Sequence, residues 1–204
     1  MSHKAAERSH NERRAGAEQA AREHGRRRRR RTLLGGAAVL ALVGIVAAMM
    51  LTSRPESSED IRTAPGFTLT DTSGAQHTLA DHRGGNVLLY FSEGAGCQSC
   101  IVQMGEIEKQ AGAFAKEDVT VLPIVMNTRA QITEDMAANG VKTPFLLDDG
   151  TVSKAFGTLG KGMHAGLPGH SFVLIDKQGQ QRWYGDYPSM WLAPQDLLEK
   201  VQKR

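Results

Sequence analysis

The sequence predicts an α/β domain with a largely parallel sheet and helices on both faces, preceded by one transmembrane helix. Two observations support this prediction. From residue 86 onward, apolar runs rich in β-branched residues alternate with segments of helical periodicity, as in sheets whose strands are joined by helices. Near the N-terminus, residues 33–51 form a stretch of nineteen residues without a charge. The two parts of the chain therefore suit different surroundings.

The uncharged stretch is long enough to cross a bilayer. Nineteen helical residues span roughly 28 Å at about 1.5 Å per residue, close to the thickness of a hydrocarbon core. A helix of a soluble protein would keep a polar face, and this stretch has none. We expect residues 32–51 to be a transmembrane anchor. The apolar run exceeds that of a secretory signal, and no clear cleavage site follows it, so we favour a retained anchor over a cleaved signal.

The segment before this stretch is strongly basic. Residues 1–31 carry ten Arg and one Lys against four Glu, a charge of +7, and since the whole chain carries +3, residues 32–204 carry −4. By the positive-inside rule we expect residues 1–31 to be a basic cytoplasmic arm and the body to be extracytoplasmic. Residues 30–34 resemble a twin-arginine export signal, which leaves the export route open.

The same basic run raises the question of nucleic acid. No aromatic residue is interleaved with the arginines to stack on bases, and the body of the chain is acidic. We therefore interpret the run as a topology determinant in contact with lipid headgroups, and we predict no nucleic-acid partner.

After the anchor, residues 52–63 are polar and predict a linker, and residues 64–204 predict one folded domain. Expected strands cover 67–70 and 76–79 as a hairpin, then 86–92, 119–126, 145–147, 171–176 and 181–184. Expected helices cover 98–116, 129–139, a short segment ending at 156, and 194–202.

The chain has two cysteines, Cys97 and Cys100, placed between an expected buried strand and an expected helix. Unpaired N–H groups and the helix dipole stabilise an anion at a helix N-terminus, so a thiol there loses its proton more readily. The thiolate is the nucleophile of disulfide exchange. Because Cys97 is nearer the helix start, we assign it as the attacking thiol and Cys100 as the resolving one.

Three other uses of the pair fit less well. A structural zinc site needs about four ligands, and the chain has no second cysteine pair. Haem attachment needs His after the second cysteine, where this chain has Ile101. A static disulfide of this spacing would be strained and labile. We therefore predict redox chemistry at the pair, with no cofactor and no metal.

Several motifs of the body resemble those of a known family. They are Ala64-Pro65-Gly66-Phe67-Thr68-Leu69, Val87-Leu88-Leu89-Tyr90-Phe91-Ser92 followed by the cysteine pair, Thr143-Pro144-Phe145, and Phe172-Val173-Leu174-Ile175-Asp176. Over residues 64–201 the chain resembles the redoxin (AhpC/TSA-like) branch of the thioredoxin-like superfamily. The resemblance implies a thioredoxin-like fold with a central mixed sheet flanked by helices. It also implies a membrane-anchored thiol–disulfide oxidoreductase that acts on protein thiols and disulfides and exchanges electrons with a second redox partner.

The chain departs from the cysteine motifs of two groups within this superfamily. Membrane-anchored thioredoxins of the cytochrome-maturation type usually carry Trp before the first cysteine, where this chain has Gly94-Ala95-Gly96. Peroxiredoxins use Pro-x-x-x-Thr-x-x-Cys, and here Tyr90 and Gly94 occupy the Pro and Thr positions. A peroxiredoxin-like peroxidase using Cys97 therefore stays a second alternative.

The resemblance also implies residues beside the dithiol. The family places a cis-proline before its third main strand, and Pro168 is the candidate for this substrate-binding position, although it lies about two residues too far from Phe172. A trans loop proline is the ordinary alternative. His164 and His170 flank Pro168. Either one, together with both thiolates, would form the copper site of a copper chaperone of the same superfamily, our first alternative function.

Overall fold

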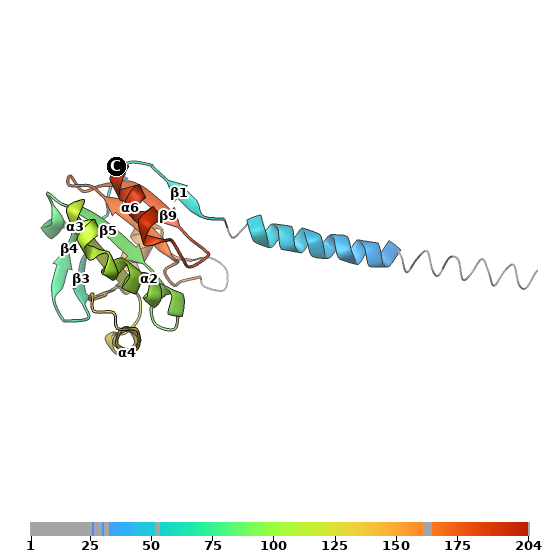
Figure 1. The fold of residues 1–204 in the computed structure, drawn as a ribbon, viewed down its shortest axis with the longest axis horizontal. Coiled ribbons are helices and arrows are strands. Elements are labelled where there is room, and N and C mark those ends of the chain that lie inside the picture. The colour runs from blue at the N-terminus through green and yellow to red at the C-terminus, as the bar shows by residue number, and fades with distance from the viewer. Residues whose placement is uncertain (1–25, 27–29, 31–32, 52–53, 161–164, 204) are drawn as a thin grey trace, which may run out of the picture. The chain divides into compact units, whose positions relative to one another are not determined.

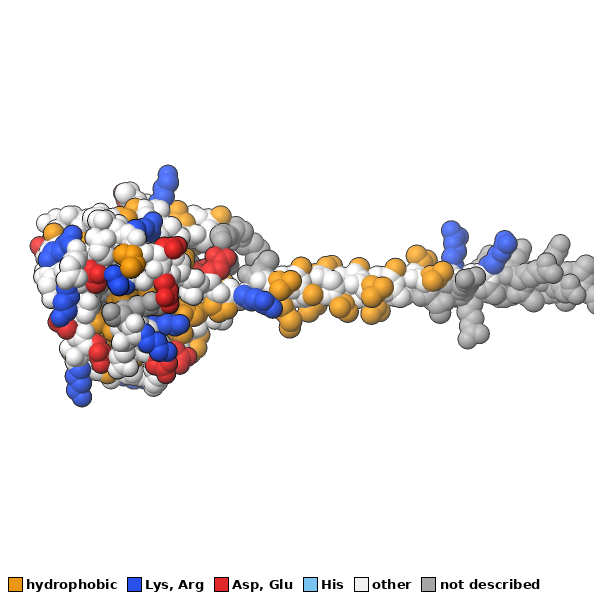
Figure 2. Space-filling view, turned by 90° about the horizontal axis from the view of Figure 1, so that it is seen from above, with side chains coloured by type: hydrophobic (Ala, Val, Ile, Leu, Met, Phe, Trp, Pro, Cys, Tyr) orange, Lys and Arg blue, Asp and Glu red, His pale blue; other side chains and the backbone are white. Residues whose placement is uncertain are grey.

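The computed structural model describes residues 26, 30, 33–51, 54–160 and 165–203. The chain divides into two units, residues 1–52 and 53–204. In the first unit, Leu33–Leu51 form a helix with a mean hydropathy of 2.4 whose side chains are all exposed. Figure 2 shows hydrophobic side chains along this helix. In the described part of the chain it is the one helix long and apolar enough to cross a membrane. The predicted cytoplasmic arm lies almost entirely outside the described residues.

The second unit is built on a mixed sheet. Its centre contains β5 (Asn86–Phe91), β6 (Val119–Val125) and β7 (Leu146–Leu147), which run parallel. On one side, β8 (Ser171–Ile175) is antiparallel to β5, and β9 (Gln180–Asp186) is antiparallel to β8. On the other side, the hairpin of β3 (Thr68–Asp71) and β4 (Gln76–Thr78) joins through β3 to β7.

This arrangement confirms the mixed sheet that the resemblance implied, and it corrects the largely parallel sheet that strand–helix alternation predicted. The difference arises at the C-terminal end of the sheet. Lys177 and Gln178 form a tight turn with Gly179, and a turn this short joins only antiparallel strands. The chain therefore returns as β9 without a crossover helix.

Helices cover both faces of the sheet (Figure 1). One face carries α2 (Gln98–Lys109), α3 (Ala111–Lys116), α4 (Arg129–Asn139) and α6 (Pro194–Gln202), and the other carries α5 (Thr151–Phe156) and the 3-10 turn η1 (Leu79–His82). Side chains alternate across β5, so that Leu88 and Tyr90 enter the first core, and Val87, Leu89 and Phe91 enter the second. A buried strand with both faces covered explains the continuous apolar run of the sequence.

The predicted polar linker is partly structured. Within it, β1 (Glu56–Ser58) and β2 (Arg62–Thr63) both pair antiparallel with β9. Short polar strands of this kind form on an edge because backbone N–H and C=O groups supply the pairing, whatever the side chains. The segment therefore protects the edge of the sheet.

Candidate active site: the cysteine pair at the start of helix α2

Cys97 and Cys100 form a disulfide, with their Cα atoms 5.3 Å apart. Helix α2 begins at Gln98, so Cys97 is its N-cap residue. Its Sγ accepts a hydrogen bond from the backbone N–H of Cys100 at 3.3 Å and lies 3.5 Å from the Ser99 hydroxyl oxygen. The Cys97 sulfur therefore sits where unpaired N–H groups of the helix favour negative charge.

The two sulfur-bearing residues differ in exposure. Cys97 is half-buried, whereas Cys100 has no exposed surface. Cys100 lies in the first turn of α2, on the face that packs against the sheet. A disulfide on another protein can therefore approach Cys97 but not Cys100.

The loop that leads into α2 is held by polar contacts from a neighbouring helix. Gly94 and Gly96 have positive φ angles of 71° and 87°, a conformation that glycine adopts without strain. The N–H of Ala95 donates to Asn127 Oδ1 at 2.8 Å, and the N–H of Gly96 donates to Asp135 Oδ2 at 2.8 Å. Asn127 precedes α4 and Asp135 lies within it, so this helix fixes the residues before Cys97. Neither side chain was predicted as a partner of the loop, because nothing in the neighbouring sequence marks Asn127 or Asp135 as such.

Behind Cys100 lies a buried polar cluster of Tyr90, Gln103 and His170, which we call the Tyr90 cluster. The Tyr90 hydroxyl donates to the carbonyl oxygen of Cys100 at 3.1 Å, and its oxygen lies 3.2 Å from His170 Nδ1. His170 Nε2 lies 3.4 Å from Gln103 Oε1. Burial raises the pKa of Tyr90 well above its ordinary value and lowers the pKa of His170 to about 4. Both groups are therefore neutral at neutral pH.

The sequence contains a signal for part of this cluster. Gln103 lies three residues after Cys100 and four before Ile107, on the apolar face of α2. A polar residue on such a face needs a buried partner. The partners themselves come from β5 and from the residue before β8, which are far away along the chain.

Pro168 is not the cis-proline that the resemblance suggested. Residues 54–160 and 165–203 contain no cis peptide bond. Leu159 and Pro168 form an antiparallel bridge, flanked by hydrogen bonds from Gly160 N to Leu167 O and from Gly169 N to Thr158 O, both 2.7 Å long. This extended pairing suits a trans Leu–Pro bond, because a residue before proline prefers extended backbone. His170, rather than a proline, directly precedes β8.

Of the residues predicted for copper, the structure describes Cys97, Cys100 and His170, and these three are not grouped as a metal site. His164 lies outside the described residues, and both ring nitrogens of His170 face polar partners, Tyr90 and Gln103. In the described ranges no group of three His, Cys, Asp or Glu side chains is placed to hold a metal ion. The described geometry therefore gives the copper alternative no support.

Residues 62–183 match the model of the AhpC/TSA family. The chain belongs to the AhpC/TSA family. The match begins at β2 and ends within β9, so it contains the cysteine pair and most of the sheet. This confirms the resemblance inferred from the sequence motifs.

Curated relatives of this AhpC/TSA-family chain carry two kinds of name. A Mycobacterium tuberculosis protein named "Putative peroxiredoxin Rv2521" is 32% identical over 99 residues, which are 48% of this chain and 63% of the relative. The thiol-disulfide oxidoreductase ResA of Geobacillus thermodenitrificans is 31% identical over 120 residues, which are 58% of this chain and 64% of that protein. The chain thus spans a little under two thirds of the length of these relatives.

Solved structures agree on the fold. The peroxidoxin BcpB of Mycobacterium tuberculosis superposes with a TM-score of 0.60 at 19% identity, covering 70% of this chain and 95% of that one. AhpC of Enterococcus faecalis superposes with a TM-score of 0.63 at 14% identity, covering 72% and 92%. Both structures confirm the predicted thioredoxin-like architecture. Because their sequence identities to this chain are below 20%, they support the fold and not a function.

Proposed function

We propose that this chain is a membrane-anchored, extracytoplasmic thiol–disulfide oxidoreductase that cycles Cys97 and Cys100 between dithiol and disulfide against protein disulfides. The observation that supports this most strongly is the asymmetry of the pair. One sulfur is accessible and caps a helix, while the other is buried one turn away. The relative named thiol-disulfide oxidoreductase supports the same reaction class.

In the proposed cycle, Cys97 is the attacking residue. Its thiolate attacks one sulfur of a client disulfide, and the other client sulfur leaves as a thiolate. Cys100 then attacks Cys97, which forms the Cys97–Cys100 disulfide and releases the second client thiol. The client gains two electrons and the chain loses two. A second redox partner must therefore restore the dithiol, and the direction of net flow depends on the potentials of client and partner.

The remaining assignments follow the same proposal. Pro168, in the segment that leads into β8, remains our candidate for contact with the client backbone, because the resemblance implies a substrate-binding proline there. The exchange needs no cofactor and no metal, because both electrons reside on sulfur. The helix of residues 33–51 anchors the chain, with the basic N-terminal arm in the cytoplasm and the redox domain outside it.

Trapping of mixed disulfides tests the proposed cycle. In Cys100→Ser, the mixed disulfide at Cys97 has no resolving thiol, so we expect clients to accumulate as covalent adducts that a reductant releases on a non-reducing gel. Cys97→Ser is the matched control, and we expect it to form few adducts because Cys100 is buried. If neither variant traps a protein in the native membrane, the chain does not exchange disulfides with proteins.

A peroxidase is the second candidate, because relatives of this chain are named as peroxiredoxins. Gly94 stands where the peroxidase pattern has Thr, so this position has no hydroxyl group that could bind a peroxide. We therefore expect the full chain, reduced and purified in detergent, to consume hydrogen peroxide no faster than Cys97→Ser does. Rapid consumption that is lost in Cys97→Ser would favour the peroxidase instead.

A further inference from the structure

Helix α4 holds the residues on both sides of Cys97. Before Cys97, the N–H of Gly96 donates to Asp135 Oδ2 at 2.8 Å. After it, Gln98 Nε2 donates to Asn139 Oδ1 at 2.5 Å. Asn139 Nδ2 in turn donates to the carbonyl oxygen of Asp135 at 2.8 Å, which ties its side chain to the preceding turn of α4. Cys97 therefore lies between two neighbours that one helix holds in place.

Helix α4 is a firm support for these contacts. Ile132 and Met136 pack into the core on one face of the sheet, Ile132 with no exposed surface. Thr128 caps the helix: its side chain accepts a hydrogen bond from the N–H of Gln131, whose side chain accepts one from the N–H of Thr128. A helix fixed at its N-terminus and along its buried face keeps the Asp135 carboxylate at a defined place beside the loop.

Asp135 is the charged member of these contacts, and it lies close to the Cys97 sulfur. From standard bond lengths, that sulfur is no more than about 8 Å from the Gly96 nitrogen. Asp135 Oδ2 is 2.8 Å from the same nitrogen. The carboxylate oxygen and the sulfur are therefore within about 11 Å of each other, comparable with the screening length of about 10 Å in 0.1 M salt. A negative charge at this range disfavours a thiolate.

Backbone N–H groups that precede the sulfur are already taken. Those of Ala95 and Gly96 donate to side-chain oxygens at and before α4. The N–H of Cys97 donates to the carbonyl oxygen of Gly94 at 3.0 Å. The N–H that the sulfur does receive is that of Cys100, at 3.3 Å. This donor and the helix dipole favour a thiolate, and the carboxylate on α4 opposes them.

The elements next to the attacking cysteine carry acidic side chains. Glu93 lies in the loop before it, and Glu134 and Asp135 lie on α4, whereas the first turn of α2 contains no acidic residue. Arg129, at the start of α4, donates to a backbone oxygen of the β3–β4 hairpin. The Tyr90 cluster adds no charge at neutral pH, because burial raises the pKa of its tyrosine and lowers the pKa of its histidine to about 4. Asp135 is the acidic group that α4 bonds to the loop backbone.

We propose that Asp135 is a positioning residue that acts on Cys97 through the Gly96 N–H, and that its charge makes the chain a reductant of client disulfides. This inference rests on the proposed exchange function and gives its net direction. A thiolate that is less stable makes the reduced form less stable, so electrons pass more readily from the dithiol to a client. The two thiols lose two electrons and two protons to the client disulfide, which becomes two thiols, and Cys97 and Cys100 form their disulfide.

Removal of the charge alone tests this role. In Asp135→Asn a side-chain oxygen remains to accept the Gly96 N–H, while the charge is lost. The full chain, carrying Cys100→Ser so that Cys97 is its one thiol, is reduced in detergent and alkylated with iodoacetamide over a range of pH. We expect the pKa of Cys97 to fall by about 0.3 to 1 unit relative to the chain with Asp135. The fall should shrink in 1 M salt, which screens the charge.

The direction of electron flow is measured on the intact cysteine pair. The chain is equilibrated with reduced and oxidised dithiothreitol at a pH above the measured pKa of Cys97. For Asp135→Asn we expect the equilibrium to move toward the dithiol by roughly two- to tenfold, because the reduced form gains the stability of its thiolate. Asp135→Ala also removes the acceptor of the Gly96 N–H, and we expect its shift to be at least as large.

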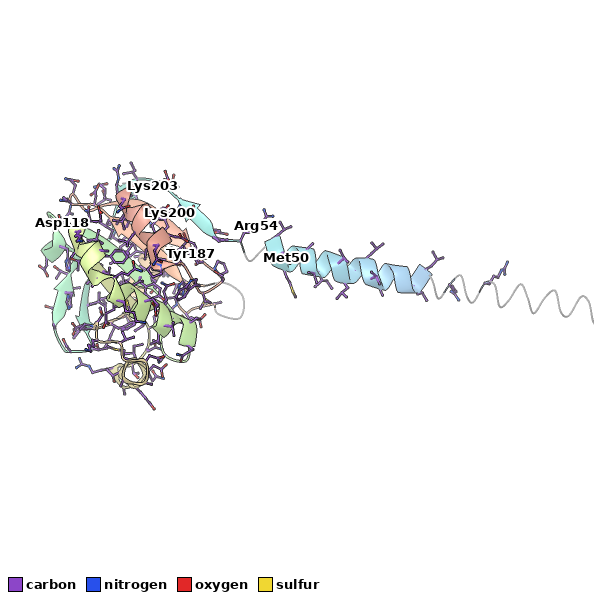
Figure 3. All side chains as sticks on the ribbon, viewed as in Figure 1. Met50, Arg54, Asp118, Tyr187, Lys200 and Lys203 are labelled. Atoms are coloured by element: carbon purple, nitrogen blue, oxygen red, sulfur yellow. A yellow bond between two sulfur atoms is a disulfide. The ribbon has the colours of Figure 1, made fainter. Side chains whose placement is uncertain are left out.

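Two variants serve as controls. Asp118→Asn makes the same change at a remote place, because Asp118 precedes β6 at the end of the sheet where β5 and β6 begin, whereas Cys97 follows the opposite end of β5 (Figure 3 labels Asp118). Glu134→Gln removes a neighbouring, exposed charge of α4. We expect the first to leave the pKa of Cys97 unchanged, and the second to shift it less than Asp135→Asn does.

A wild-type pKa of Cys97 and a wild-type dithiothreitol equilibrium in Asp135→Asn would overturn the inference, and so would an equal pKa shift in Glu134→Gln. If one of the two Asp135 variants fails to fold by circular dichroism, the other decides by the same criterion. The proposed exchange function fails separately, if Cys100→Ser traps no client. Trapped clients together with an unshifted pKa would refute the role of Asp135 alone.

Discussion

At the residue scale, the proposed reactivity of the site depends on where each cysteine lies relative to the first turn of α2. Cys97 at the N-cap has its sulfur beside the N–H of Cys100, and this contact stabilises a thiolate there. Cys100 belongs to the first turn itself and is covered by the sheet. The three residues before Cys97 must bend sharply to place its sulfur at the helix end, and this bend depends on glycine.

Gly94→Ala should therefore destabilise the domain. Gly94 has a φ of 71°, and an added Cβ would overlap the side chains of Asn127 and Val125. We expect a loss of about 1–3 kcal/mol in the free energy of unfolding, measured by chemical denaturation. Gly84→Ala is the control, since Gly84 has a φ of 92° but open space around its Cβ position. Equal losses in the two variants would show that backbone strain alone, and not the close approach of Asn127, requires glycine at position 94.

At the element scale, the β3–β4 hairpin is held by one carboxylate. Asp71 Oδ1 accepts hydrogen bonds from the N–H groups of Ser73, Gly74 and Ala75 and from the Ser73 hydroxyl, and Oδ2 lies 2.8 Å from His77 Nε2. Burial by itself would raise the pKa of Asp71, but the hydrogen bonds from Ser73, His77 and Ala75 outweigh it and lower the pKa to about 2. The ionised carboxylate thus closes the turn between the two strands.

This carboxylate predicts a specific dependence of stability on pH. Because the pKa of Asp71 is lower in the folded chain, its contribution is present above the unfolded value near 3.8 and is lost as pH falls toward 2. We expect Asp71→Asn to lower the free energy of unfolding by about 1–2 kcal/mol at pH 6, after allowance for solvent screening at a surface hairpin. The difference from wild type should shrink between pH 4 and pH 2 in denaturation curves. A difference that is constant over this range would mean that ionisation of Asp71 does not contribute.

At the scale of the whole molecule, two units with opposite surface character share one chain. The helix of residues 33–51 exposes apolar side chains throughout, whereas the domain of residues 53–204 buries its apolar residues in two cores. In the proposed membrane anchor, a bilayer would remove the first set of side chains from water. The basic run before the helix then favours one orientation.

Anchoring and orientation can be measured on intact cells. We expect the full chain to stay in the membrane fraction after an alkaline carbonate wash, and a C-terminal tag to be accessible to protease from outside the cytoplasm. Leu40→Arg with Val43→Arg should release a large fraction, since each Arg at a helix centre costs about 2.5–3.5 kcal/mol of insertion. Leu40→Ala with Val43→Ala serves as the control for side-chain size. A soluble product that lacks the N-terminal residues would indicate a cleaved signal instead of an anchor.

Local signals in the sequence determined most of the elements and the position of the cysteine pair at the start of a helix. Helical periodicity and capping are local properties, so each of these features can be recognised from a short stretch of sequence. This holds for the uncharged stretch, for the apolar runs and for the position of Cys97 at a helix start. The helix predicted over residues 98–116 was correct except for a break at Gln110, which divides it into α2 and α3. The two β-strands in the predicted linker were missed, because edge pairing leaves no pattern in polar side chains.

Only the tertiary structure decided what surrounds the two sulfurs. Asn127 and Asp135 reach the loop from α4, and Tyr90, Gln103 and His170 meet behind Cys100 from two strand ends and a helix. The tertiary structure also shows that Pro168 is not preceded by a cis peptide bond and that His170 directly precedes β8. The physical reason is the same in each case. Exposure and hydrogen bonding depend on residues that lie far apart along the chain, such as Tyr90 and His170, which are separated by 80 residues. No local sequence pattern indicates such contacts.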